Sequence, residues 1–374
     1  MAKDWNLILE QSRHIADPVA DDVVEAIYTK NDLAEINRIF NVMIENDDLP
    51  LTEMPPEVQQ YLLQTSPLPD WADADKLKLA SDVFDAFGIP IVFMLFGASL
   101  PVLYAAHPGA EILVATTRMT EQLPRRIVET AQFVMNVTAP NAFDDTGRGI
   151  RSTQKVRLMH ATIRRFIRNS PEWGKLWNND HYGLPINQSD LAATMLSFSS
   201  VVIGCMKRSA IELSDEQTEA YLHLWKVVGF ILGVQEQLIP TDLKEANDLF
   251  NTWAKLNHKD TSTGRELTKV LIAFMQQHTP IAKSLPTDWM RYWLGTELSS
   301  MLGIPGYNWT VIILWIQRKM WSTKQGDSRN PVLEQIHQFF VRGFLNSLLT
   351  IQRGGKRSKF ELPSSLTSKA GIGA

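Results

Sequence analysis

Apolar residues recur along this chain at the spacing of one face of a helix, and no segment alternates as a half-buried strand does. An early example is the set Leu33, Ile36, Phe40 and Met43. Two pairs, Ser214 with Gln217 and Asp242 with Glu245, have the spacing of a capping box, which marks a helix start. No Asn-Gly or Asp-Gly turn joins two alternating runs. The sequence therefore predicts an all-α fold.

The chain offers no clear linker at which to divide it. Of its 374 residues, 44% are hydrophobic and 21% are charged, which is ordinary for a globular protein. Residues 169–187 are rich in Trp, Asn, Gly and Pro and predict a long irregular connection. Residues after Arg353 turn to Gly, Lys and Ser. We therefore expect one helical domain over residues 1–352 and an extended tail over 353–374.

Charge and cysteine content exclude several classes of function. The net charge is −4 and no basic stripe carries interleaved aromatic residues, so we expect no nucleic-acid partner. The single cysteine, Cys205, excludes a disulfide framework and a covalently attached c-type haem. The first residues mix apolar and charged side chains without the apolar core of a signal peptide. We expect a cytoplasmic protein, and the oligomeric state is not predicted.

One segment, Ala86 to Ala106, is long and uncharged enough to raise the question of a membrane. Pro90 and Pro101 lie inside it. A membrane-spanning helix and a buried core helix broken near its ends both explain this composition. Membrane association therefore stays open and is not predicted.

A possible metal site lies in the segment from residue 147 to 168, which is a good helix from Thr153 onward. Arg157, His160 and Arg164 occupy one stripe of that helix at i, i+3 and i+7. Such a stripe can be an ordinary half-buried polar surface. It can also bind haem, because a neutral imidazole ligates iron and guanidinium groups pair with the haem propionates.

A preceding helix, predicted from Leu123 to Val137, carries a second set of polar groups. Arg126 and Thr130 are i, i+4 neighbours, and Glu129 lies close to both. Arg126 and Glu129 can form a simple surface pair. Alternatively, the cation and the hydroxyl can face a pocket and hold an oxygen species by charge-assisted hydrogen bonds.

These helices belong to four stretches whose order and spacing are similar to those of a known family. The stretches are the helix with Arg126 and Thr130, V-R-L-M-H-A-x-x-R from 156 to 164, P-I-N-Q-S-D-L from 185 to 191, and Y-L-x-L-W-x-x-V-G-x-x-x-G-V from 221 to 234. As a set they resemble the latex-clearing rubber oxygenase/MpaB-like family. The resemblance covers roughly residues 85–245.

The resemblance implies an all-α fold with a globin-like core around one b-type haem, in residues 85–245. His160 matches the proximal iron ligand of the family, and Arg126 and Thr130 match residues on the oxygen-binding side. The implied activity is oxidative cleavage of a carbon–carbon double bond by O₂. The implied substrate is an apolar molecule, either isoprenoid or otherwise unsaturated.

Two positions depart from the pattern of the rubber-cleaving members. The slot just before the threonine, where those members have lysine, holds Glu129. The family also has an upstream glutamate proposed to remove an allylic proton, and Glu111 is the nearest candidate here. A carboxylate beside apolar residues can act as such a base, or it can equally cap a helix at the surface.

Haem needs an apolar sleeve, which residues 87–103, 191–203 and 227–234 can supply. Phe198 and Trp225 are candidate pocket walls, although large aromatics on such runs are often plain core. Gly229, with Gly233 four residues later, allows close approach to a macrocycle or to another helix. Two alternatives to an oxygenase stay open: a non-catalytic haem carrier or sensor, and a helical protein without a cofactor.

Overall fold

The computed structural model describes residues 3–31, 35–36, 38–39, 54–116, 119–145, 147–170, 173–277 and 285–306. Within these residues the regular structure is helical, apart from one isolated bridge between Ala106 and His258. The predicted all-α class is confirmed. The predicted tail over 353–374 lies outside the described residues, as do Leu33, Phe40 and Met43, whereas Ile36 is buried.

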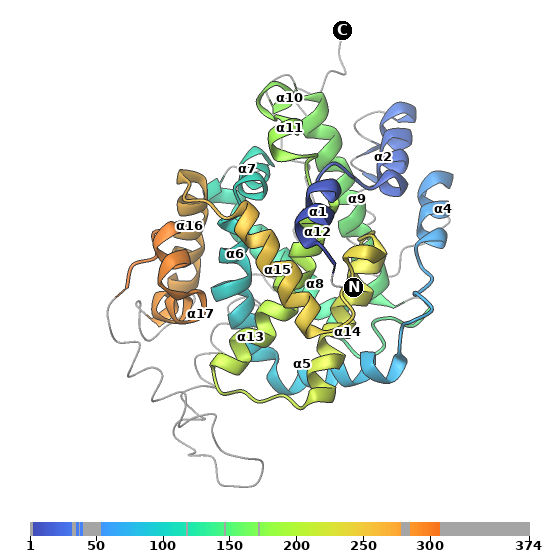
Figure 1. Ribbon diagram of the computed structural model, residues 1–374. Helices are drawn as coiled ribbons and strands as arrows, with labels where there is room; N and C mark the ends of the chain where they lie inside the picture. Colours follow the sequence, from blue (N-terminus) through green and yellow to red (C-terminus); the bar gives the residue numbers. More distant parts are fainter. Residues whose placement is uncertain are drawn as a thin grey trace.

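The first half of the chain runs to the helix that carries His160 (Figure 1). Its elements are α1 (Trp5–Ser12), α2 (Pro18–Lys30), α4 (Pro56–Gln64), α5 (Ala74–Met94), the π-helix η2 (Leu95–Ser99), α6 (Leu100–Tyr104), α7 (His107–Thr116), α8 (Met119–Thr138) and α9 (Arg148–Asn169).

The second half of the chain begins with two short helices, which lie in the connection over residues 169–187 that we predicted to be irregular. These are α10 (Trp173–Leu176) and α11 (Asn179–Tyr182). The remaining elements are α12 (Gln188–Phe198), α13 (Ser200–Arg208), α14 (Asp215–Ile231), the 3₁₀ helix η3 (Glu236–Leu238), α15 (Leu243–Asn257), α16 (Ser262–Gln277) and α17 (Leu285–Met301).

The helix starts follow from local chemistry. Ser214 accepts a hydrogen bond from the backbone N–H of Gln217, and the Gln217 side chain accepts one from the Ser214 N–H, which completes the predicted capping box of α14. Asp242 accepts from the N–H of Glu245 at the start of α15. The Glu245 carboxylate accepts from Thr241 instead, so this second box is only half formed.

The uncharged segment from 86 to 106 forms the end of α5, the π-helix η2 and α6. Pro90 lies inside α5, and residues 95–99 of η2 are all buried. At Gly97, an added Cβ atom would lie 2.6 Å from the Trp293 ring, so glycine lets α17 pack closely here. Much of this segment is therefore core of the described structure.

Two stretches meet the length and composition of a membrane span. One is Gln188–Arg208, and the other is the bent pair Ala74–Gly88 with Pro90–Tyr104. In the first, 78% of the apolar window is buried inside the protein, as in the core helix of a globular fold. Length and composition alone are weak grounds for a membrane span.

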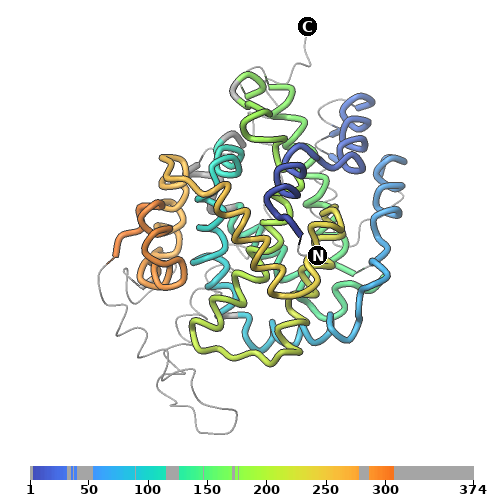
Figure 2. The backbone as a smooth tube through the Cα atoms, viewed as in Figure 1, coloured from blue at the N-terminus to red at the C-terminus, as the bar shows by residue number. Residues whose placement is uncertain are grey.

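The second half of the chain supplies several of the largest side chains of the core that the described helices enclose. Trp225, Tyr221 and Trp253 are almost fully buried there. Helix α14 packs along α5, and α9 packs against both α2 and α8. Figure 2 shows α2 and α4 (blue) on one side of the molecule and α16 and α17 (orange) on the other. This arrangement places the helix with His160 inside the bundle.

Candidate functional site

His160 lies in the middle of α9, on a helix with many buried side chains. Its Nδ1 atom is buried and has no hydrogen-bond partner among the described residues. Burial lowers the pKa of His160 to about 3, with further contributions from the cations Arg164 and Arg126. The imidazole is therefore neutral near pH 7, which is the form that ligates a metal.

Helix α8 brings Arg126 into the neighbourhood of this imidazole. Burial lowers the pKa of Arg126, and the charge of Glu129 and the hydroxyl of Tyr104 oppose that shift. Tyr104 is only 2% exposed. In turn, burial raises the pKa of Tyr104, and the charge of Arg126 works against it. The structure thus gathers His160, Arg126 and Tyr104 in one low-dielectric region.

Thr130 lies one turn after Arg126 and donates a hydrogen bond from Oγ1 to the Arg126 carbonyl, at 2.8 Å. It also lines a small cavity of about 10 Å³. The other lining residues are Val92, Leu95, Phe96, Leu100, Ala131, Val134 and Phe198. Every wall residue except Thr130 is apolar. This volume is on the order of what one water molecule needs and is far below the roughly 300–1,000 Å³ of small-molecule pockets.

An ion-pair ladder joins α9 to the start of the chain. Arg157 forms two bonds to Asp17, from Nε to Oδ2 at 2.6 Å and from Nη2 to Oδ1 at 2.7 Å. Arg164 donates from Nε to Asp21 at 2.7 Å. Farther along the same two helices, Arg165 and Arg168 both form ion pairs with Glu25. Because Asp17, Asp21 and Glu25 are four residues apart, they lie on one face of α2 and match the arginine face of α9.

The ladder bears on the prediction that Arg157 and Arg164 bind haem propionates. Arg157 also donates to the Ile231 carbonyl at 3.1 Å, so all three of its nitrogens are engaged. Arg164 keeps one buried nitrogen, Nη2, without a partner among the described residues. A propionate role for Arg157 would require breaking the Asp17 pair, whereas Arg164 retains one available donor. Both roles stay predictions.

The two carboxylates predicted for the site are not among the residues that line the apolar cavity. Glu111 on α7 accepts a hydrogen bond from Thr263 at 2.7 Å, and its Oε1 lies 3.7 Å from His107 Nδ1. It is partly exposed and is not among the residues that line the apolar cavity. Glu129 is exposed. Their predicted catalytic roles are left open by these positions.

The predicted pocket aromatics are close together. Phe198 lines the cavity, and its ring centroid lies 4.9 Å from that of Trp225, which is 1% exposed behind it. Gly229 serves helix packing, because an added Cβ atom would lie 2.2 Å from Met195 Sδ on α12. Of the two explanations for this glycine, close approach of a helix is the one that the contacts support.

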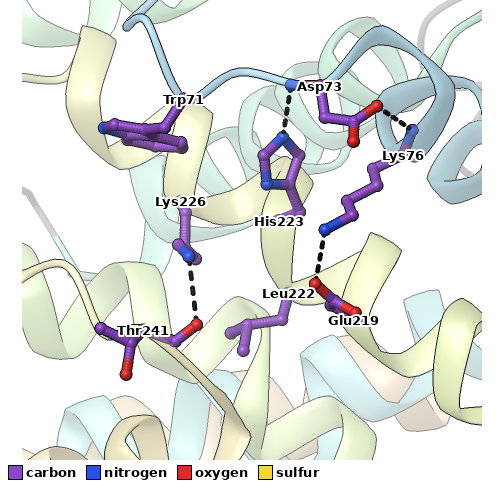
Figure 3. A pocket seen from close by; sticks show the side chains of 8 residues that line it. All are labelled: Trp71, Asp73, Lys76, Glu219, Leu222, His223, Lys226 and Thr241. Carbon is purple, nitrogen blue, oxygen red and sulfur yellow. Dashed lines mark hydrogen bonds and ion pairs between the residues drawn. The ribbon is translucent and has the colours of Figure 1, made fainter.

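His223, on α14, belongs to a different part of the molecule. Its Nε2 accepts a hydrogen bond from the Asp73 backbone N–H at 3.0 Å, in a surface recess beside Trp71 (Figure 3). The fourth stretch of the family pattern therefore contributes Trp225 and Gly229 to the interior, and His223, which is itself buried, to the wall of a surface recess.

Sequence reasoning missed three residues near the site. Tyr104 lies near the end of the long apolar run, and the available signal was that it is the one tyrosine of a segment without charges. Asp17 and Asp21 share a four-residue spacing that complements Arg157 and Arg164. That signal became meaningful only when the pairing of α2 with α9 was known.

Comparison with known proteins decides the family. Residues 86–321 match the family described as ER-bound oxygenase mpaB/B'/rubber oxygenase, catalytic domain. This chain belongs to that oxygenase family. The matched span includes α6 to α9, and hence His160, Arg126 and Thr130. The recognition of the rubber oxygenase/MpaB-like family from its motifs is confirmed.

One protein is similar to this chain in sequence, and one solved structure is similar to it in fold. The rubber oxygenase of Streptomyces sp. (strain K30) is 25% identical over 292 residues, which are 78% of this chain and 71% of the relative. A solved structure of latex clearing protein LCP in the closed state superposes with a TM-score of 0.78 at 23% identity. That match covers 94% of this chain and 95% of the other. It establishes the shared all-helical fold.

Proposed function

We propose that this protein is a haem b-dependent oxygenase that cleaves or oxidises a carbon–carbon double bond of an apolar, isoprenoid-type substrate with O₂. The observation that carries the proposal is His160: a neutral imidazole with a buried, uncommitted nitrogen, on the helix next to Arg126. Membership of an oxygenase family supports the reaction class. The name of the rubber oxygenase relative supports a polyisoprene-like substrate.

The residues present fit a haem. His160 would hold the iron, because a buried imidazole that stays neutral keeps a lone pair for a metal. The side chains around Thr130 are apolar, as the sleeve of a macrocycle requires, and the unpartnered Nη2 of Arg164 suits a propionate. When bound, haem iron supplies the binding and activation of O₂.

Arg126 and Thr130 are the chain's own contribution to the chemistry. Arg126 keeps its charge in a low-dielectric region, where a cation stabilises developing negative charge more strongly than in water. Thr130 adds a hydroxyl to a cavity wall that is otherwise apolar. Its proton is held by the Arg126 carbonyl, which leaves the oxygen lone pairs to accept a hydrogen bond.

The apolar side chains around Thr130 indicate the kind of substrate that this region would accept. Side chains such as Val92, Leu95 and Phe96 offer no hydrogen bonds, so they favour a hydrocarbon chain and exclude water. Glu111 is the candidate that would take up a proton from the substrate, with Thr263 orienting its carboxylate.

The test is an absorption spectrum of the purified, haem-supplemented protein, oxidised and reduced, with a pyridine haemochrome assay. We expect about one haem b per chain and its loss in His160→Ala. A matched control is His258→Ala, which also removes a histidine whose pKa is lowered by burial, but at the C-terminal cap of α15. Stoichiometric haem in His160→Ala, with the wild-type spectrum, would remove His160 as the ligand.

A non-catalytic haem protein is the second candidate, and Glu129 supports it. An acidic residue occupies the position where rubber-cleaving members are expected to have lysine. Oxygen uptake distinguishes the two. We expect O₂ consumption that depends on an unsaturated isoprenoid, and haem binding without such consumption would favour the carrier or sensor.

A further inference from the structure

A surface recess lies where the start of α5 meets α14, away from the residues of the proposed oxygenase site. It has a volume of about 180 Å³. Figure 3 shows its lining residues: Trp71, Asp73, Lys76, Glu219, Leu222, His223, Lys226 and Thr241. None of them belongs to α8 or α9. Any ligand bound here is therefore recognised independently of His160.

His223 presents a fixed hydrogen-bond donor to this recess. Because its Nε2 accepts from the Asp73 N–H at 3.0 Å, that nitrogen carries no proton. The proton of the neutral ring is then on Nδ1. Figure 3 shows Nδ1 on the side of the ring that faces Trp71 and Lys226, and it has no hydrogen-bond partner among the described residues. Burial lowers the pKa of His223 to about 4, which keeps this tautomer neutral.

Lys226 adds a cation with spare donors. Its Nζ atom has one long hydrogen bond, 3.4 Å to the Thr241 carbonyl, and lies 5.4 Å from the centroid of the Trp71 ring. An ammonium group has three N–H donors, so two remain for another partner. Burial lowers the pKa of Lys226, and an added anion would offset that cost.

The other charges around the recess already have partners. Lys76 pairs with Glu219, and Asp73 accepts from two backbone N–H groups at the start of α5. Two further acids act on Lys226 through space. Of these, Asp242 caps α15, and Glu245 pairs with Lys3 and Thr241. Lys226 and His223 are thus the groups left to recognise a ligand.

The apolar part of the recess is flat. The indole of Trp71 is 36% exposed and is held by edge contacts with His223 and Phe230, at centroid distances of 5.7 and 6.1 Å. Leu222 adds an aliphatic surface. A wall of this kind favours a planar ligand.

We propose that this recess is a second binding site, which takes a small planar organic carboxylate. The carboxylate accepts hydrogen bonds from His223 Nδ1 and Lys226 Nζ, and the planar body lies against Trp71. A neutral amide of the same shape loses the charge interaction with Lys226. Discrimination between acid and amide is therefore the signature of the site.

Benzoate is the probe, with benzamide as the neutral comparison of equal shape. Titration of the purified full-length protein, followed by ligand-observed NMR, is expected to give millimolar binding of benzoate and at least 10-fold weaker binding of benzamide. Lys226→Met is expected to weaken benzoate at least 10-fold. The control is Lys244→Met, which removes a lysine that is 86% exposed and paired with Asp248 on α15.

Thermal unfolding of each variant shows whether it is folded, and the acid–amide comparison on the wild-type protein needs no variant. Equal binding of benzoate and benzamide would overturn the proposal, as would benzoate affinity unchanged in Lys226→Met. Absence of benzoate binding up to tens of millimolar would overturn it as well. His223→Phe, which keeps an aromatic ring beside Trp71 but removes the donor, is expected to weaken benzoate several-fold.

Discussion

The guanidinium of Arg157 and the carboxylate of Asp17 form a two-bond ion pair, with both residues less than 10% exposed. Arg157 lies one turn before His160 on α9. Asp17 lies at the start of α2, well before the residues 86–321 that match the family's catalytic domain. A segment outside that domain thus helps to hold the helix that carries the candidate iron ligand.

Replacing Asp17 with Ala would leave Arg157 buried and uncompensated. Breaking a buried pair from one side costs about 3–5 kcal/mol. We expect a loss of this order in the free energy of unfolding, measured by urea denaturation. The control is Glu25→Ala at the solvent-exposed end of the same ladder, where Glu25 is 50% exposed. It is expected to cost less than about 1 kcal/mol.

The double variant Asp17→Leu, Arg157→Leu extends this test. Removing both charges leaves no buried unpaired charge, so we expect it to be more stable than Asp17→Ala. The single variants Asp17→Leu and Arg157→Leu complete the comparison. If their losses in unfolding free energy simply added in the double variant, the ion pair would not be the source of the stabilisation.

The ladder also illustrates what the sequence could reveal. Ser214 and Gln217 are three residues apart, so the start of α14 could be predicted from local chemistry alone. Asp17 and Arg157 are 140 residues apart, and Asp73 and His223 are 150 apart. Pairs at such separations depend on how the helices pack. The motifs therefore predicted the helices and His160, whereas the partners of Arg157 and the position of His223 required the structure.

Substitution of Gly229 tests whether the close packing of α12 requires a residue without a side chain at this position. In Gly229→Ala, the new Cβ atom would clash with Met195 Sδ, so we expect a loss of about 1–3 kcal/mol in unfolding free energy. Gly204 on α13 is the matched control, because an added Cβ atom there meets nothing within 4 Å. Gly204→Ala is expected to stabilise the helix by up to about 1 kcal/mol. Equal effects at both positions would contradict this packing account.

Arg126 and Thr130 are expected to affect turnover more than cofactor content. If the proposed oxygenase function holds, Arg126→Ala or Thr130→Val would lower kcat by roughly 10²–10³-fold, the scale for loss of one electrostatic or hydrogen-bonding group. Haem content, measured by the pyridine haemochrome assay, should stay near that of the wild-type protein. Met135→Ala, on the same helix but 42% exposed, is the control. Unchanged oxygen uptake in both variants would exclude these residues from the reaction.

His258 predicts how stability depends on pH. Burial lowers its pKa to about 4, and its Nε2 is buried without a partner among the described residues. In the unfolded chain its pKa is about 6.5. The unfolded state therefore binds more protons below pH 6.5, and stability that is present at pH 7 is lost as the pH falls toward 4. Between pH 7 and pH 5 the loss in unfolding free energy amounts to about 1–2 kcal/mol for His258.

Urea denaturation at both pH values should show a smaller decrease in unfolding free energy for His258→Gln than for the wild-type protein. Equal decreases would mean that the folded protein protonates His258 as readily as the unfolded chain does.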